Sequence, residues 1–62
     1  MLSLSLPVEL LVSILNTYLR SKYQSLVDLC EYEDLCYDNL IEKLSENNYY
    51  YNKTLNQIKF NA

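Results

Sequence analysis

The sequence predicts an all-α protein, a small helical hairpin or a bundle of three to four helices that a second copy of the chain completes. Apolar residues recur at spacings of three and four residues over most of the chain, which is the period of an amphipathic helix. Half of the 62 residues are apolar at a net charge of −3, which favours a folded chain over a disordered one. Chains below roughly 70–80 residues rarely stabilise themselves with one core, so we expect a homodimer.

The first helix is predicted over residues 7–21 and follows an N-terminal arm, residues 1–6. Pro7 marks the start, because proline carries the backbone angle of a first helical turn and the carboxylate of Glu9 favours the positive end of the helix dipole. Leu10 widens the apolar side, which then needs more than one neighbour to cover it. The other apolar residues at helical spacing are Val8, Leu11, Val12, Ile14, Leu15, Tyr18 and Leu19.

The second helix is predicted over residues 23–45, with a break near residues 31–34. In one continuous helix Glu33 would lie on the apolar side and Leu35 on the polar side, and Asp34 is a suitable N-cap for a new segment. Because no glycine or proline marks the break, one long bent helix is the alternative. Together the two helices supply the expected core or dimer face: Leu11, Ile14, Leu15, Tyr18, Leu26, Leu40 and Leu44.

A short C-terminal helix is predicted over residues 49–60. Tyr51 and the apolar residues four and seven positions later, up to Ile58, have helical spacing, whereas neither alternate set of positions forms an apolar strand face. The structural alternative is a strand at residues 2–6, where leucine and serine alternate, paired with residues 57–60.

Catalysis and cofactor binding are not expected. The chain contains no glycine and no histidine, so it cannot form a glycine-rich phosphate loop, and it lacks the commonest general base and metal ligand. Zinc would need two ligands besides Cys30 and Cys36, and the side chains of the adjacent Glu33 and Asp34 diverge on a helix. We therefore predict a non-enzymatic protein without a metal or a cofactor.

The cysteine content favours an intracellular protein. Two cysteines without a signal peptide are typical of a reducing compartment, so we expect the cytoplasm. Glu9 interrupts the apolar N-terminal stretch before it reaches membrane-spanning length, so no membrane association is expected. Abundant asparagine and tyrosine suit an AT-rich genome such as that of a phage or another virus, in which case the location is the host cytoplasm.

Negative charge is concentrated in the middle of the chain. The first 22 residues carry a net charge of +1 and the last 20 carry +2, whereas the segment between Lys22 and Lys43 carries −6. Such a segment repels phosphate backbones, so we expect no direct nucleic-acid binding, and it attracts a protein with a basic surface. A solvated face that keeps the chain soluble is the alternative. The candidate partner-binding residues are Asp28, Glu31, Tyr32, Glu33, Asp34, Tyr37 and Asp38.

Residues 6–15, with the sequence Leu-Pro-Val-Glu-Leu-Leu-Val-Ser-Ile-Leu, resemble the opening of an F-box. The resemblance covers about ten positions well and implies a helical adaptor that docks a ubiquitin-ligase subunit. The residues that it would assign to docking are Leu6, Pro7, Leu10, Leu11, Ile14 and Leu15.

These observations lead to three functional hypotheses. The first is a small protein-binding regulator or inhibitor that uses the acidic, tyrosine-bearing central segment and an apolar helix face. The second is a structural subunit of a helical homo-oligomer, and the third is the F-box-like adaptor.

Overall fold

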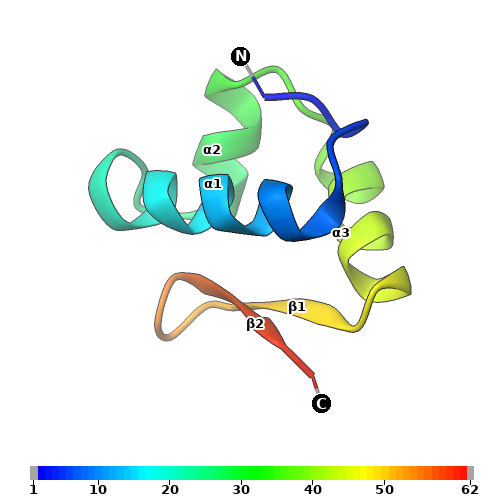
Figure 1. Ribbon diagram of the computed structural model, residues 1–62. Coiled ribbons are helices and arrows are strands. Elements are labelled where there is room, and N and C mark those ends of the chain that lie inside the picture. The colour runs from blue at the N-terminus through cyan, green and yellow to red at the C-terminus, as the bar shows by residue number, and fades with distance from the viewer. Residues whose placement is uncertain (1, 62) are drawn as a thin grey trace.

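The structure, a computed structural model, describes residues 2–61 and contains a β-hairpin besides helices. The all-α prediction is therefore wrong, and the protein is mixed α and β (Figure 1). In chain order the elements are α1 (Val8–Ser21), α2 (Leu26–Tyr32), α3 (Tyr37–Glu46), β1 (Tyr49–Asn52) and β2 (Gln57–Phe60).

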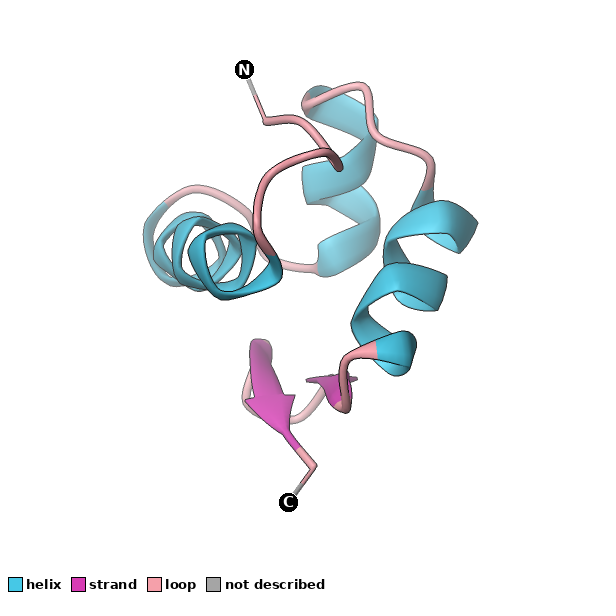
Figure 2. Ribbon diagram, turned by 45° about the vertical axis from the view of Figure 1, so that its right-hand side comes forward, coloured by secondary structure: helices cyan, strands magenta, loops and turns pink. Residues whose placement is uncertain are grey.

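The helices lie above the hairpin, as Figures 1 and 2 show. α1 packs on β2 and α3 packs on β1, while α2 contacts both other helices. The core fills the space between helices and hairpin and consists mainly of leucine. Its buried residues are Leu2, Leu11, Leu15, Leu19, Leu26, Leu29, Cys30, Leu40, Leu44 and Ile58.

The apolar side of α1 is covered within the monomer. Leu11 and Leu15 are 0% exposed and Leu19 is 4% exposed, because α2, β2 and the N-terminal arm pack around them. Among the apolar residues of α1, Leu10 is the one that is exposed, at 49%. The surplus apolar surface from which we expected a homodimer is therefore occupied by elements of the same chain.

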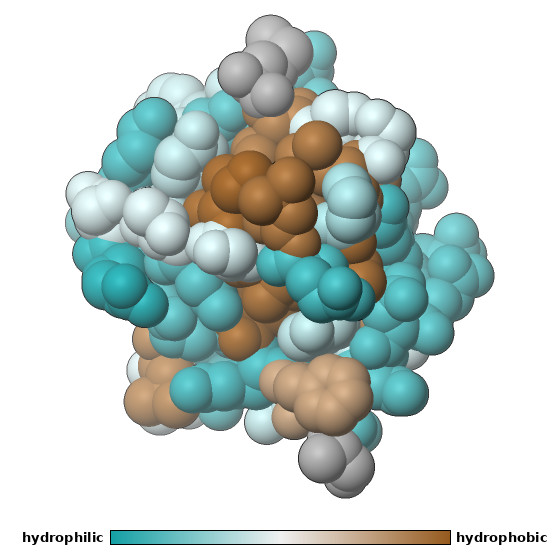
Figure 3. Space-filling view, in the orientation of Figure 1, coloured by the Kyte–Doolittle hydropathy of each residue, from teal (hydrophilic) through white to brown (hydrophobic). Residues whose placement is uncertain are grey.

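The N-terminal arm is held by a lysine of α3. The ammonium group of Lys43 donates hydrogen bonds to the carbonyl oxygens of Leu4 and Leu6, the second at 2.9 Å. Leu2 is buried at the start of the arm. Figure 3 shows apolar residues gathered where the arm passes over α1, with hydrophilic residues around them.

Two separate helices, α2 and α3, occupy the segment for which we predicted one helix with a break. Asp34 does not cap α3 as we predicted; it has a left-handed backbone with φ 59° and follows the end of α2, while Cys36 is the N-cap of α3. The amide of Leu35 donates to the carbonyl of Cys30 at 2.8 Å, which closes a Schellman-type turn. Aspartate tolerates the left-handed region, so the helix ends here without a glycine.

The predicted C-terminal helix over residues 49–60 is also wrong, because this segment forms the antiparallel pair β1 and β2. The register opposes Tyr49 to Phe60 and Tyr51 to Ile58, so these four residues share one face of the hairpin. The rings of Tyr49 and Phe60 pack edge to face with centroids 5.2 Å apart. An apolar face thus arises from both strands together.

The alternative strand pairing between residues 2–6 and 57–60 is not formed either. Residues 2–6 form a turn and an extended arm, and β1 is the strand paired with residues 57–60. Asn48 and Asn56 have left-handed backbones, with φ 64° and 54°, before β1 and before β2. Asparagine tolerates this region as aspartate does, so the hairpin forms without glycine.

Candidate functional site

Six of the seven predicted partner-binding residues lie on the surface. Asp28, Glu31 and Tyr32 are exposed on α2, and Tyr32 is the most exposed large hydrophobic residue at 77%. Asp34 is exposed in the turn after α2, and Tyr37 and Asp38 are exposed in the first turn of α3. We refer to the carboxylates Asp28, Glu31, Asp34, Asp38 and Glu42 as the acidic face; all five are exposed.

Part of this negative charge also stabilises the helices. Asp28 and Asp38 lie in the first turns of α2 and α3, where a carboxylate favours the positive end of the helix dipole. Ser25 caps α2, since its hydroxyl accepts a hydrogen bond from the amide of Asp28 at 3.1 Å. Two of the five carboxylates therefore have a local structural role besides any role in binding.

Glu33 is the exception among the predicted residues, because its carboxylate serves the fold. The side chain is 13% exposed, and its Oε2 accepts a hydrogen bond from the phenol of Tyr23 at 2.6 Å. The ammonium of Lys22 lies 4.0 Å from the same oxygen and 4.6 Å from the ring centroid of Tyr18. Tyr32 stacks on Tyr23 at a centroid distance of 5.9 Å. This cluster joins the end of α1 to α2.

Substituting Tyr23 by phenylalanine should remove a pH-dependent part of the stability. The hydrogen bond to Glu33 favours the neutral phenol and is the main reason that the pKa of Tyr23 rises from 10.0 to about 12. A pKa raised by folding stabilises the folded chain below about pH 10, and this contribution is lost as the pH rises to about 12.

Thermal melts at about pH 9 and about pH 12 measure this contribution. We expect the wild type to have a higher Tm than Tyr23→Phe at the lower pH and the difference to close at the higher pH. Tyr50→Phe is the control, since its ring is 45% exposed. A gap of the same size at both pH values would contradict the role of this hydrogen bond.

A groove with four tyrosines among its eight lining residues runs between α3 and β1, with a volume of about 340 Å³. Tyr37, Ile41, Leu44 and Ser45 line it from α3, at the three- and four-residue spacing of one helix face. Tyr49, Tyr50, Tyr51 and Lys53 line it from the hairpin. We call these eight residues the tyrosine groove. Of them only Tyr37 is among the predicted partner-binding residues, and the three consecutive tyrosines at 49–51 are the sequence signal for the wall that the hairpin supplies.

The tyrosine groove lies beside part of the acidic face. Asp38 and Glu42 each follow a groove-lining residue of α3 by one position, so they project about 100° further round the helix. Lys53 is the positively charged residue of the lining. The groove can therefore offer aromatic ring faces and an ammonium group in its lining, with two carboxylates further round α3.

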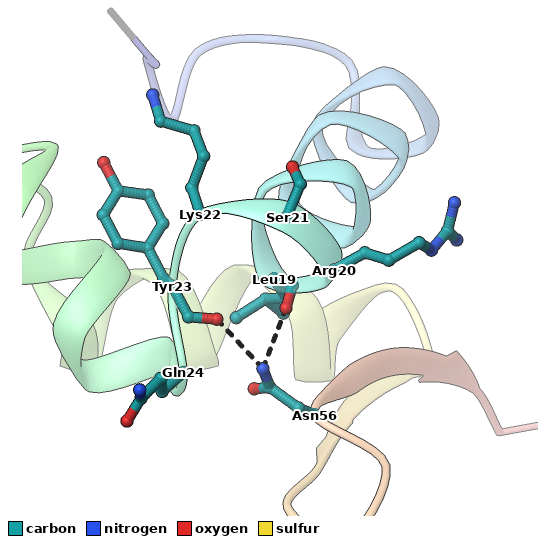
Figure 4. A pocket seen from close by; sticks show the side chains of 7 residues that line it. All are labelled: Leu19, Arg20, Ser21, Lys22, Tyr23, Gln24 and Asn56. Atoms are coloured by element: carbon teal, nitrogen blue, oxygen red, sulfur yellow. Dashed lines mark hydrogen bonds between the residues drawn. The ribbon is translucent and has the colours of Figure 1, made fainter.

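A second hollow, of about 490 Å³, lies at the end of α1 and is lined by residues 19–24 and Asn56 (Figure 4). The amide nitrogen of Asn56 donates hydrogen bonds to the carbonyl oxygens of Leu19 and Tyr23, at 3.0 and 3.1 Å. Its Oδ1 accepts one from the phenol of Tyr51 at 2.6 Å. Both polar atoms of Asn56 are thus used in hydrogen bonds within the chain. These bonds join the end of α1 to the hairpin, so the hollow has a structural role.

The other predicted residues belong to the core or its margin. Of the expected core or dimer face, Ile14 and Tyr18 are half-buried and the five leucines are buried. Among the six residues that the F-box resemblance assigns to docking, Leu11 and Leu15 are buried in the chain's own core. A partner could reach these two only if the helices separated.

The two cysteines differ in exposure. Cys30 is buried, which raises the pKa of its thiol, while Cys36 is exposed, and neither forms a disulfide. Within residues 2–61, no three side chains of metal-ligating type come together. No helix in this part of the chain has the length and apolar character needed to cross a membrane.

The fold and the site define a small α/β module with three helices on a β-hairpin, an acidic helical face and a tyrosine-lined groove. The chain belongs to the family described as "Domain of unknown function (DUF4250)", whose family model matches residues 7–58. This range extends from the start of α1 into β2 and includes the whole tyrosine groove. No curated protein and no solved structure matches the chain.

Proposed function

We propose that this protein is a small non-enzymatic regulator or inhibitor that binds a partner protein through the acidic face. The observation that carries the proposal is the absence of compensating charge: within residues 2–61 the one ion pair joins Lys22 to Glu33. The carboxylates of the acidic face are thus exposed to solvent, and in this part of the chain none of them forms an ion pair with a lysine or arginine. A basic surface on a partner would supply the missing positive charge and speed association.

The tyrosines support a binding role. Tyr32 and Tyr37 are exposed between the carboxylates, and tyrosine adds contact area at an interface at a low cost in conformational entropy. Two unpaired cysteines suit a reducing compartment, so we place the binding in the cytoplasm.

The first experiment is affinity capture from a lysate of the source organism at low and at moderate salt. Wild type is compared with a neutral variant carrying Asp28→Asn, Glu31→Gln, Asp38→Asn and Glu42→Gln. We expect a partner that the wild type retains and the neutral variant loses. Light scattering on the same preparation measures self-association, which the homo-oligomer hypothesis requires.

With the purified partner, the neutral variant should bind at least about fourfold more weakly, because exposed charge pairs contribute about 0.2–1 kcal/mol each and four of them contribute at least about 0.8 kcal/mol. About 1.4 kcal/mol corresponds to tenfold in Kd. The salt dependence of the affinity should flatten as well. Glu9→Gln, which removes one carboxylate from α1, is the matched control. Equal affinity and equal salt dependence for wild type and the neutral variant would reject the proposal.

A further inference from the structure

We propose that the outer edge of β1 and the tyrosine groove bind an extended, basic segment of the partner by β-strand addition. This inference rests on the proposed function and specifies how the partner is held. Backbone groups of the added segment would pair with β1, and every second side chain would enter the groove.

The two edges of the hairpin are not equivalent, because α1 closes the edge of β2. Oδ1 of Asn16 accepts a hydrogen bond from the amide of Ile58 at 2.6 Å, and its Nδ2 donates one to the carbonyl of Ile58 at 3.1 Å. The side-chain amide of Asn16 thus takes the place that a neighbouring strand would occupy. A further strand cannot add at this position of β2.

The same hydrogen bonds show that backbone groups on the outer edge of β1 are available to a further strand. Both backbone groups of Ile58 point away from β1, so Tyr51, which lies opposite, belongs to a pair without mutual hydrogen bonds. The backbone N–H and C=O of Tyr51 therefore point outwards, and those of Tyr49, two residues earlier, do the same. The sheet has two strands within residues 2–61, so no third strand covers these groups.

The tyrosine groove follows this open edge. Side chains alternate between the two faces of a strand, yet three consecutive residues, Tyr49 to Tyr51, line one groove. A groove that touches three consecutive strand residues lies along the strand edge. In Figure 2, α3 lies above β1 on the side away from α1. The helix and the strand edge thus form the two walls of a slot for an extended chain.

The negative charge beside the groove favours a basic segment of a partner over a second copy of this protein. Asp38 and Glu42 lie beside the groove on α3, and the segment between Lys22 and Lys43 carries −6. Two copies joined edge to edge would each bring a net charge of −3 to the interface. A segment with lysine or arginine would instead pair with the carboxylates and place its cation against tyrosine rings. The ammonium group of Lys53 on the hairpin repels other cations. The lysine or arginine of the segment should therefore lie in the part nearest α3.

The test uses random dodecapeptides displayed on phage and selected against the intact 62-residue chain. We expect the selected peptides to contain lysine or arginine in an extended, alternating pattern. N-methylation of a selected peptide at each residue in turn should weaken binding about three- to tenfold at every second position, since one backbone hydrogen bond is lost there. A selection without binders, or a scan without this period of two, would overturn the inference.

Three forms of the chain complete the experiment. Chemical synthesis with an N-methyl group on Tyr51 removes one outward amide, and we expect about three- to tenfold weaker binding of the unmodified peptide if circular dichroism shows a folded chain. Asp38→Asn with Glu42→Gln should weaken binding by a similar factor, whereas Asp28→Asn with Glu31→Gln on α2 should weaken it less, because the groove is lined from α3 and the hairpin. Equal losses in both charge pairs would support the acidic face as the binding surface but overturn strand addition. No loss in either pair, with no effect of the N-methyl group, would reject both.

Discussion

Asn56→Ala is expected to lower the free energy of unfolding by about 3 kcal/mol. The substitution leaves the carbonyls of Leu19 and Tyr23 without their hydrogen-bond donor, and each unsatisfied group that is buried costs about 1–3 kcal/mol. The phenol of Tyr51 loses its acceptor but still accepts a hydrogen bond from the amide of Leu26. Alanine at φ 54° adds about 1–2 kcal/mol of backbone strain. Since total stability amounts to about 0.05–0.15 kcal/mol per residue, or about 3–9 kcal/mol for 62 residues, this loss removes about a third of the stability or more.

Urea denaturation separates the effect of the lost hydrogen bonds from that of the backbone strain. Asn56→Gly removes the side chain but accepts the left-handed backbone, so it should be about 1 kcal/mol more stable than Asn56→Ala. Asn47→Ala is the matched control, because the exposed amide of Asn47 donates to one carbonyl, that of Lys43, at 2.8 Å. Its loss should be below about 1 kcal/mol. Equal losses in the free energy of unfolding at positions 47 and 56 would show that the hydrogen bonds of Asn56 do not hold the hairpin on α1.

Asn16→Ala should cost about 2 kcal/mol and release the hairpin from α1. Both backbone groups of Ile58 lose their partner, and Ile58 is 3% exposed, so water reaches them poorly. Amide exchange at Ile58 should accelerate together with the loss in stability. Thr17→Ala is the control one residue further along α1, since that hydroxyl donates only to the exposed carbonyl of Ser13. If Ile58 exchanges equally fast in wild type and Asn16→Ala, the contact does not protect the edge.

Local pattern was informative where one element decides the burial of its own residues. The spacing of Leu11, Leu15 and Leu19 places them on one side of a helix, and the structure buries that side. The concentration of carboxylates between Lys22 and Lys43 can also be counted without a structure. The fold class could not be predicted in this way, because the helical spacing of Tyr51 and Ile58 also fits a hairpin.

The candidate site could likewise be predicted only where single helices determine it. The acidic residues of the site follow from their exposure on helices, and six of the seven predicted residues are exposed. Glu33 differs because Tyr23, ten residues away, takes up its carboxylate. The tyrosine groove could not be predicted, since its two walls come from α3 and from the edge of a strand that the helical interpretation did not contain.

The sequence by itself determined the amphipathic side of α1, the negative charge of the central segment and the lack of histidine and glycine chemistry. Only the tertiary structure decided the hairpin, its one open edge and the roles of Asn16 and Asn56. The reason is physical: helical hydrogen bonds and faces repeat within four residues, whereas a strand gains its partners from another segment. The contact between Asn16 and Ile58 spans 42 positions, and no local spacing encodes it.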